Sequence, residues 1–237
     1  MMSEHKNNCL ICGAEIEYFP EVRKMECLIC HEEYESTVCC KEGHFICDTC
    51  HAKNGVDIVI ETCRHTKSKN PIEIILGLME QPFIHMHGPE HHVMVGAVLL
   101  AAYKNAGGQL DFERALREMK RRGSQVPGGV CGYWGSCGAA VSTGIFMSII
   151  TEASPLSKEA WRHCNTMTGR VLNAVGDIGG PRCCKRNSYT AILNAIDYVS
   201  EHFGIQMEKP PCLKCTFTKF NEQCLQADCP YFMGKEL

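Results

Sequence analysis

"HMHGPEHHVMVGAVLLAAY", residues 85–103, carries the pattern that decides the fold: four histidines stand before an almost uninterrupted apolar run. Proline is favoured at the start of a helix because its fixed φ suits the first turn, so Pro89 predicts where a helix begins. The helix is expected to reach about Asn105, where Gly107 and Gly108 end it. The stretch therefore predicts a long apolar helix with histidines before and at its start.

Helical patterns continue on both sides of this stretch. Asn70 and Pro71 predict the start of a short helix, and Asp111 is a typical N-cap for a segment that Gly123 ends. No alternating strand pattern occurs after residue 66, so this part of the chain is predicted to be all-α. The further helices are expected over residues 71–80, 112–122, 137–150, 157–175 and 183–203.

The composition favours a metalloprotein of a reducing compartment. The chain has 237 residues, a net charge of −3 and 18 cysteines. It has neither the run of about 18 apolar residues that spans a membrane nor a signal-peptide pattern, so we expect a cytoplasmic protein without a membrane partner. Reducing compartments keep thiols free, so the cysteines indicate metal ligands rather than disulfides, and their ease of oxidation suits an anaerobe. The lack of a basic patch argues against a nucleic-acid partner.

Cysteine pairs separated by two residues dominate residues 1–66. Two such turns can bind one zinc ion tetrahedrally, which predicts a zinc-ribbon-like module whose metals are structural. The first site is expected to use Cys9, Cys12, Cys27 and Cys30. The second is expected to use Cys47 and Cys50 with His44 and one of Cys39 or Cys40. A cross-braced arrangement, which pairs the first turn with the third, is the alternative.

The polar stretch TKSKNP, residues 66–71, indicates a linker to an all-α helical domain over residues 70–205. A cysteine-rich tail follows over residues 206–237. Its cysteines suit a closed zinc site or a [4Fe–4S] cluster, and the final Cys-Pro favours the cluster. These four residues are Cys212, Cys215, Cys224 and Cys229. The predicted fold is therefore mainly α, with a metal-binding module at each end.

A candidate active site is expected in the helical domain, where three segments place soft ligands at helix starts. Glycines surround Cys131 and Cys137 ahead of one helix, whose N-terminus favours the thiolate form. Cys183 and Cys184 begin another helix, and we expect one of them to be a ligand while the other packs. Glu90 either supplies a carboxylate or stabilises the helix dipole. The expected site residues are His87, His91, Cys131, Cys137 and Cys183 or Cys184.

The motifs GHFICDTCH, HGPEHH, GVCGYWGSCGAA and CCKRNSYTAI, with the four-cysteine tail, resemble an uncharacterised cysteine-rich domain family of archaea and anaerobic bacteria. The resemblance covers nearly the whole chain. It implies occurrence beside, or fusion to, radical S-adenosylmethionine proteins, and it implies no established activity. Residues 85–203 are more loosely similar to helical redox-active cysteine proteins through SCGAAVSTG and CC. The chain departs from those proteins at the lead cysteine, where His91 or His92 stands.

Two functions fit these features. The first is an enzyme or enzyme accessory in redox, sulfur or one-carbon chemistry, with a reactive site of histidine and cysteine. The second is a non-catalytic zinc or iron–sulfur adaptor or carrier that docks to a partner, such as a radical S-adenosylmethionine or other redox enzyme. An open coordination position predicts chemistry, whereas a closed one predicts a scaffold. The sequence has no GxSxG, HExxH or P-loop pattern, which argues against a simple hydrolase.

Overall fold

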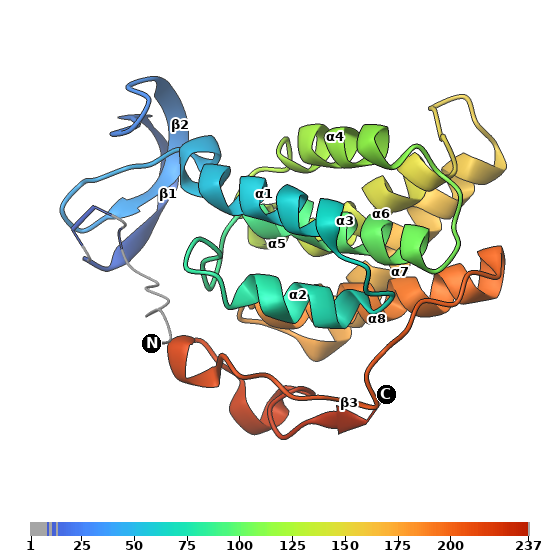
Figure 1. Ribbon diagram of the computed structural model, residues 1–237. Helices are drawn as coiled ribbons and strands as arrows, with labels where there is room; N and C mark the ends of the chain where they lie inside the picture. The colour runs from blue at the N-terminus through green and yellow to red at the C-terminus, as the bar shows by residue number, and fades with distance from the viewer. Residues whose placement is uncertain (1–8, 10, 13, 237) are drawn as a thin grey trace.

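A computed structural model describes residues 9, 11–12 and 14–236. The protein is mainly helical, with a two-stranded antiparallel hairpin at its N-terminal end and a tail that runs beneath the helices in the view of Figure 1. The central helix, α3 (Glu90–Asn105), has the bounds expected from Pro89 and the two glycines. It is buried along nearly its whole length because apolar side chains surround its axis.

The other helices pack around α3. Five of them, α1, α2, α4, α6 and α8, lie against it, while α7 packs against α6 and α8. The predicted caps explain two of the helix starts, because the Asn70 side chain accepts hydrogen bonds from two backbone N–H groups of α2 and Asp111 accepts one from Arg114. These helices are α1 (Asp48–His65), α2 (Pro71–Met79), α4 (Phe112–Gly123), α5 (Val130–Tyr133), α6 (Gly138–Ile150), α7 (Glu159–Ile178) and α8 (Cys184–Phe203).

The N-terminal hairpin consists of β1 (Ile16–Glu26) and β2 (Glu33–Cys40). Its register runs from Ile16 opposite Cys40 to Glu26 opposite Glu33, with an irregularity between Tyr18 and Arg23. Among the described residues, the apolar cluster at the hairpin is small and consists of the buried Cys27, Phe45 and Cys47. So few buried side chains need an additional source of stability, such as bound metal.

Helix α1 packs with the helical core, although the sequence places it in the N-terminal module. Residues 1–66 were expected to form one metal-binding module, but the apolar side chains of α1 are buried in the helical core, Val56, Val59 and Cys63 among them. The stretch 66–70 is a short loop between α1 and α2, as its polar residues predict. The helical core, as defined by side-chain packing, therefore begins at Asp48. Helix α1 connects the hairpin directly to this core.

The tail folds back onto the helical core. Its strands β3 (Cys212–Leu213) and β4 (Lys235–Glu236) pair with each other, and the hydroxyl groups of Thr190 on α8 and Tyr231 lie 3.0 Å apart. Short 3-10 turns occupy Thr218–Phe220 and Gln226–Asp228. In the part of the chain that the structure describes, no helix combines the length and apolar character needed to cross a membrane.

Candidate metal centres

Two four-residue groups in the N-terminal region have the tight geometry of metal sites. Within each group the ligand atoms all lie within 4.8 Å of one another. Four thiolates around one zinc ion are about 3.8 Å apart, since the bonds are about 2.3 Å long and tetrahedral. The first group is Cys9, Cys12, Cys40 and His44, and the second is Cys27, Cys30, Cys47 and Cys50.

The two groups alternate along the chain, so the sites are cross-braced. The grouping of Cys9 and Cys12 with Cys27 and Cys30, as in a zinc ribbon, is therefore wrong. Strand β1 separates these two turns, and eleven extended residues span on the order of 30 Å. The cross-braced alternative also needs correction, because the first turn meets the end of β2 rather than the third CxxC turn.

The hairpin also distinguishes between the adjacent residues Cys39 and Cys40. Successive side chains of a strand point to opposite faces, so only one of the two can reach the first site. Cys40 belongs to the group and accepts a hydrogen bond from the backbone N–H of His44 at 3.2 Å. Cys39 belongs to neither group.

The thiols of the second group can all ionise only if a cation is bound between them. Burial opposes ionisation of Cys27, but backbone N–H groups, led by that of Cys30, lower its pKa to about 6. Burial and neighbouring thiols raise the pKa of Cys50 to about 12. Four sulfur atoms this close repel one another as thiolates, so their full ionisation requires a bound positive ion.

A third group lies where the hairpin joins the helical core. It combines His51 of the first turn of α1, His85 of the loop before α3, and Glu90 of the first turn of α3. The three ligand atoms lie within 4.8 Å of one another, and the distance from His85 Nδ1 to a Glu90 carboxylate oxygen is 3.3 Å. Two histidines and one carboxylate form a common metal-binding set.

The burial of its polar atoms indicates that the third group is a ligand-binding site. Glu90 is fully buried, so it does not act as an exposed first-turn residue. One of its carboxylate oxygens accepts a hydrogen bond from the backbone N–H of His85 at 2.9 Å. The other oxygen and Nδ1 of His51 have no hydrogen-bond partner among the described residues. Buried polar atoms without a partner cost about 1–3 kcal/mol each, so such atoms indicate a ligand-binding role.

The ionisation states in the third group suit a metal. Burial lowers the pKa of His51 and keeps its imidazole neutral. Burial would raise the pKa of Glu90, but the hydrogen bond to His85 and the nearby histidines lower it to about 2. A neutral imidazole and an ionised carboxylate are the forms that bind a metal.

The third group borders a cavity of about 680 Å³ between the hairpin and the helical core. This volume lies within the usual range of small-molecule sites, about 300–1,000 Å³. His51 and His85 contribute to its wall, and three of the residues expected in the central site do so as well. These three are His87, Cys131 and Cys184.

The remaining residues of the expected central site lie elsewhere. His91 is buried, with Nδ1 3.2 Å from the carbonyl oxygen of Gly88. Cys137 is buried and accepts a hydrogen bond from the side-chain amide of Asn187 at 3.3 Å. Cys183 lines a second, smaller cavity. The structure therefore does not bring the expected ligands together: His87, Cys131 and Cys184 line the large cavity, Cys183 lines the smaller one, and His91 and Cys137 line neither.

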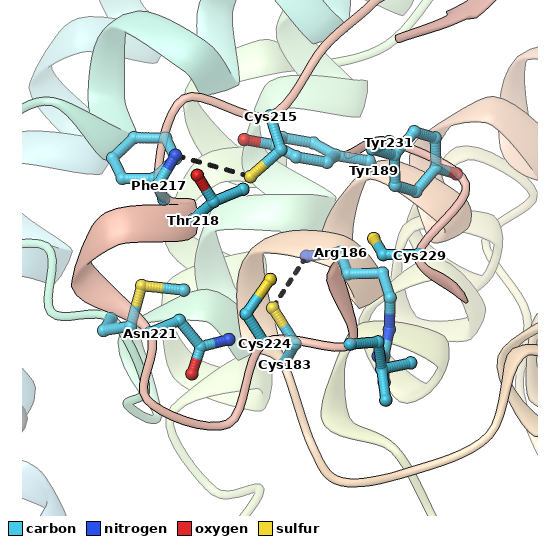
Figure 2. A pocket seen from close by; sticks show the side chains of 12 residues that line it. Cys183, Arg186, Tyr189, Cys215, Phe217, Thr218, Asn221, Cys224, Cys229 and Tyr231 are labelled. Atoms are coloured by element: carbon cyan, nitrogen blue, oxygen red, sulfur yellow. Dashed lines mark hydrogen bonds between the residues drawn. The ribbon is translucent and has the colours of Figure 1, made fainter. Parts of the chain in front are cut away.

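The smaller cavity gathers cysteines from α8 and the tail. Figure 2 shows Cys183 at the start of α8 facing Cys215, Cys224 and Cys229. Cys212, which was expected in the tail site, is exposed and does not line this cavity. Three of the four tail cysteines thus line this cavity together with Cys183, and their grouping around one ion or cluster stays a prediction.

Comparison with known proteins gives one match. Residues 59–232 match the model of a family of unknown function, DUF5714. The matched range includes His85, Glu90 and the cysteines of the smaller cavity, but it begins after His51. No curated protein and no solved structure shows detectable similarity to the chain.

Proposed function

Since the chain belongs to the DUF5714 family, whose function is unknown, we propose its function from its own residues: it is a metal-dependent enzyme. Its reactive ion is held by His51, His85 and Glu90 at the wall of the large cavity. The observation that carries this proposal is the number of ligands in each of the three groups. The two N-terminal groups supply four ligands each and suit structural zinc, whereas the third supplies three beside a cavity.

Three protein ligands leave a coordination position for water or substrate. A zinc or iron(II) ion held in this way polarises a bound oxygen atom or activates water. The protein contributes a preformed ligand set: Glu90 is held by the backbone of His85, and His51 is fixed at the start of α1 by the adjacent ligand Cys50. The second zinc site therefore also positions a ligand of the third.

The cavity wall favours a small anionic substrate. Arg182 lines the cavity, and its Nε atom is buried without a hydrogen-bond partner among the residues described. Arginine binds carboxylate and phosphate groups through paired N–H donors. Cys131 and Cys184 also line this cavity, which supports redox or sulfur chemistry there.

The alternative function is a non-catalytic zinc or iron–sulfur adaptor. The two four-ligand groups support it, because closed sites usually serve structure. A partner such as a radical S-adenosylmethionine enzyme would then supply the chemistry. The two functions differ in whether the third ion accepts a ligand from solution.

We expect the full chain with both N-terminal sites filled by zinc to bind one further cobalt(II) ion. His51→Ala or Glu90→Gln should weaken this binding more than the about 10- to 100-fold that changes in outer-shell partners cost. The absorption spectrum of the bound cobalt gives both the affinity and the ligand type. Azide should change the spectrum, because an open position accepts an added ligand.

His65→Ala is the matched control, since this exposed histidine is also on α1 and pairs only with Glu61 at the helix surface. It should leave cobalt binding unchanged. An ion whose spectrum does not respond to azide would favour the adaptor. Equal cobalt affinity in the parent, His51→Ala and Glu90→Gln proteins would reject the site.

A further inference from the structure

The smaller cavity has features of a buried cofactor site. It lies between Cys183, Cys215, Cys224 and Cys229 and has a volume of about 10 Å³, against about 680 Å³ for the large cavity. Aromatic side chains of Tyr189, Phe217 and Tyr231 complete its wall (Figure 2). Tyr189 is fully buried, and its hydroxyl group has no hydrogen-bond partner among the described residues. A polar atom left unpaired beside four thiols indicates an occupant that the side chains themselves do not supply.

Backbone N–H groups point at three of the four sulfur atoms. Cys183 accepts a hydrogen bond from Arg186 at 3.5 Å, Cys215 accepts one from Phe217 at 3.4 Å, and Cys224 accepts one from Gln226 at 3.4 Å. Two of these contacts are drawn in Figure 2. Hydrogen bonds of this kind stabilise thiolates and are typical of cysteines that bind iron–sulfur clusters.

Two buried cations next to Cys183 suit an anionic occupant. Lys185 has no exposed surface and Arg186 is 3% exposed. Lys185 interacts electrostatically with Glu90 and, after it, with Cys184, Cys183 and Cys215. The guanidinium of Arg186 donates hydrogen bonds to the carbonyl oxygens of Gly179 and Pro181. Buried charges are costly unless an opposite charge compensates them. Four thiolates around a metal cluster carry such a charge.

The cysteines of this cavity are less tightly grouped than those of the N-terminal sites, which suits a cluster better than a single ion. In both N-terminal groups the ligand atoms lie within 4.8 Å of one another, as one zinc ion requires. Among the described residues, no three of the cavity's cysteines meet that criterion. A cubane cluster holds its thiolates further apart, because each thiolate binds a different iron atom.

We propose that Cys183, Cys215, Cys224 and Cys229 bind a [4Fe–4S] cluster in this cavity. Each thiol loses its proton and forms one bond to one iron atom of the cluster. Lys185 and Arg186 compensate the negative charge, and the aromatic wall excludes water. The proposal does not depend on the site of His51, His85 and Glu90, because the two sites lie in different cavities.

The test uses the full chain, purified without oxygen and reconstituted with iron and sulfide. We expect about four iron atoms and four sulfide ions per chain, the broad visible absorption of a [4Fe–4S] cluster, and an EPR signal on reduction. Iron bound singly in the N-terminal sites carries no sulfide, so the sulfide content identifies the cluster. Cys183→Ala should abolish both spectral signals.

Cys212→Ala is the matched control, because this exposed tail cysteine lies outside the cavity. It should keep the full cluster content. If Cys183→Ala fails to fold, Cys224→Ala tests the same prediction on the partly exposed side of the cavity. A full cluster in the Cys183→Ala or Cys224→Ala protein, its loss in Cys212→Ala, or one zinc ion without sulfide at this site would overturn the proposal.

Discussion

Removal of zinc from the two N-terminal sites should unfold the hairpin and leave the helical core folded. The hairpin buries few apolar side chains of its own, whereas α1 and α3 share the large core of the protein. Structural zinc contributes about 10–16 kcal/mol of binding free energy in small domains, far more than this hairpin can replace. Hydrogen exchange should show loss of protection over residues 14–47 after chelation, while protection within α3 persists.

Single substitutions distinguish the cross-braced pairing from a zinc ribbon. Cys27→Ser should release one zinc ion and expose Cys47 and Cys50 to alkylation, while Cys9 and Cys12 stay protected. The control is Cys39→Ser, which changes a hairpin cysteine outside both groups and should retain both ions. Alkylation of Cys9 and Cys12 in the Cys27→Ser protein, with Cys47 and Cys50 still protected, would contradict the pairing.

The helices could be predicted because their signals are local. Asn70 and Asp111 cap the helices that they precede, and Pro89 stands where α3 begins. The apolar side chains of α1 were also visible in the sequence, but the neighbouring cysteine pairs suggested a separate module. Which core a helix joins depends on the faces of other helices, and no local pattern contains that information.

The grouping of ligands could not be predicted from spacing alone. The spacing identifies Cys9, Cys12, Cys27 and Cys30 as ligand candidates, but strand pairing decides which turns meet. One feature of the sequence could have identified His51 as a ligand candidate, because it directly follows a zinc-binding turn. The directions of neighbouring side chains also differ: Cys183 is the extended residue before α8 and Cys184 is its first helical residue, and the two line different cavities.

Gly88→Ala should strongly weaken metal binding at the third site without a change to any ligand. A Cβ atom at this position would overlap both carboxylate oxygens of Glu90. Glu90 is fully buried and held by the backbone of His85, so the added methyl group must displace the carboxylate or the loop. Cobalt titration should show affinity at least about 100-fold lower, at the upper end of what outer-shell changes cost. Overpacking should also lower the free energy of unfolding by about 1–3 kcal/mol.

Gly77→Ala provides the control for this substitution. Gly77 lies on α2, where a Cβ atom would meet nothing within 4 Å. Alanine is more favourable than glycine inside a helix, so this change should raise the free energy of unfolding by up to about 1 kcal/mol and leave cobalt binding unaltered. The two positions differ mainly in the atoms that an added Cβ would contact. Normal cobalt affinity in the Gly88→Ala protein would mean that Glu90 is not fixed in place, and the third group would then lack the rigid ligand on which a reactive metal site depends.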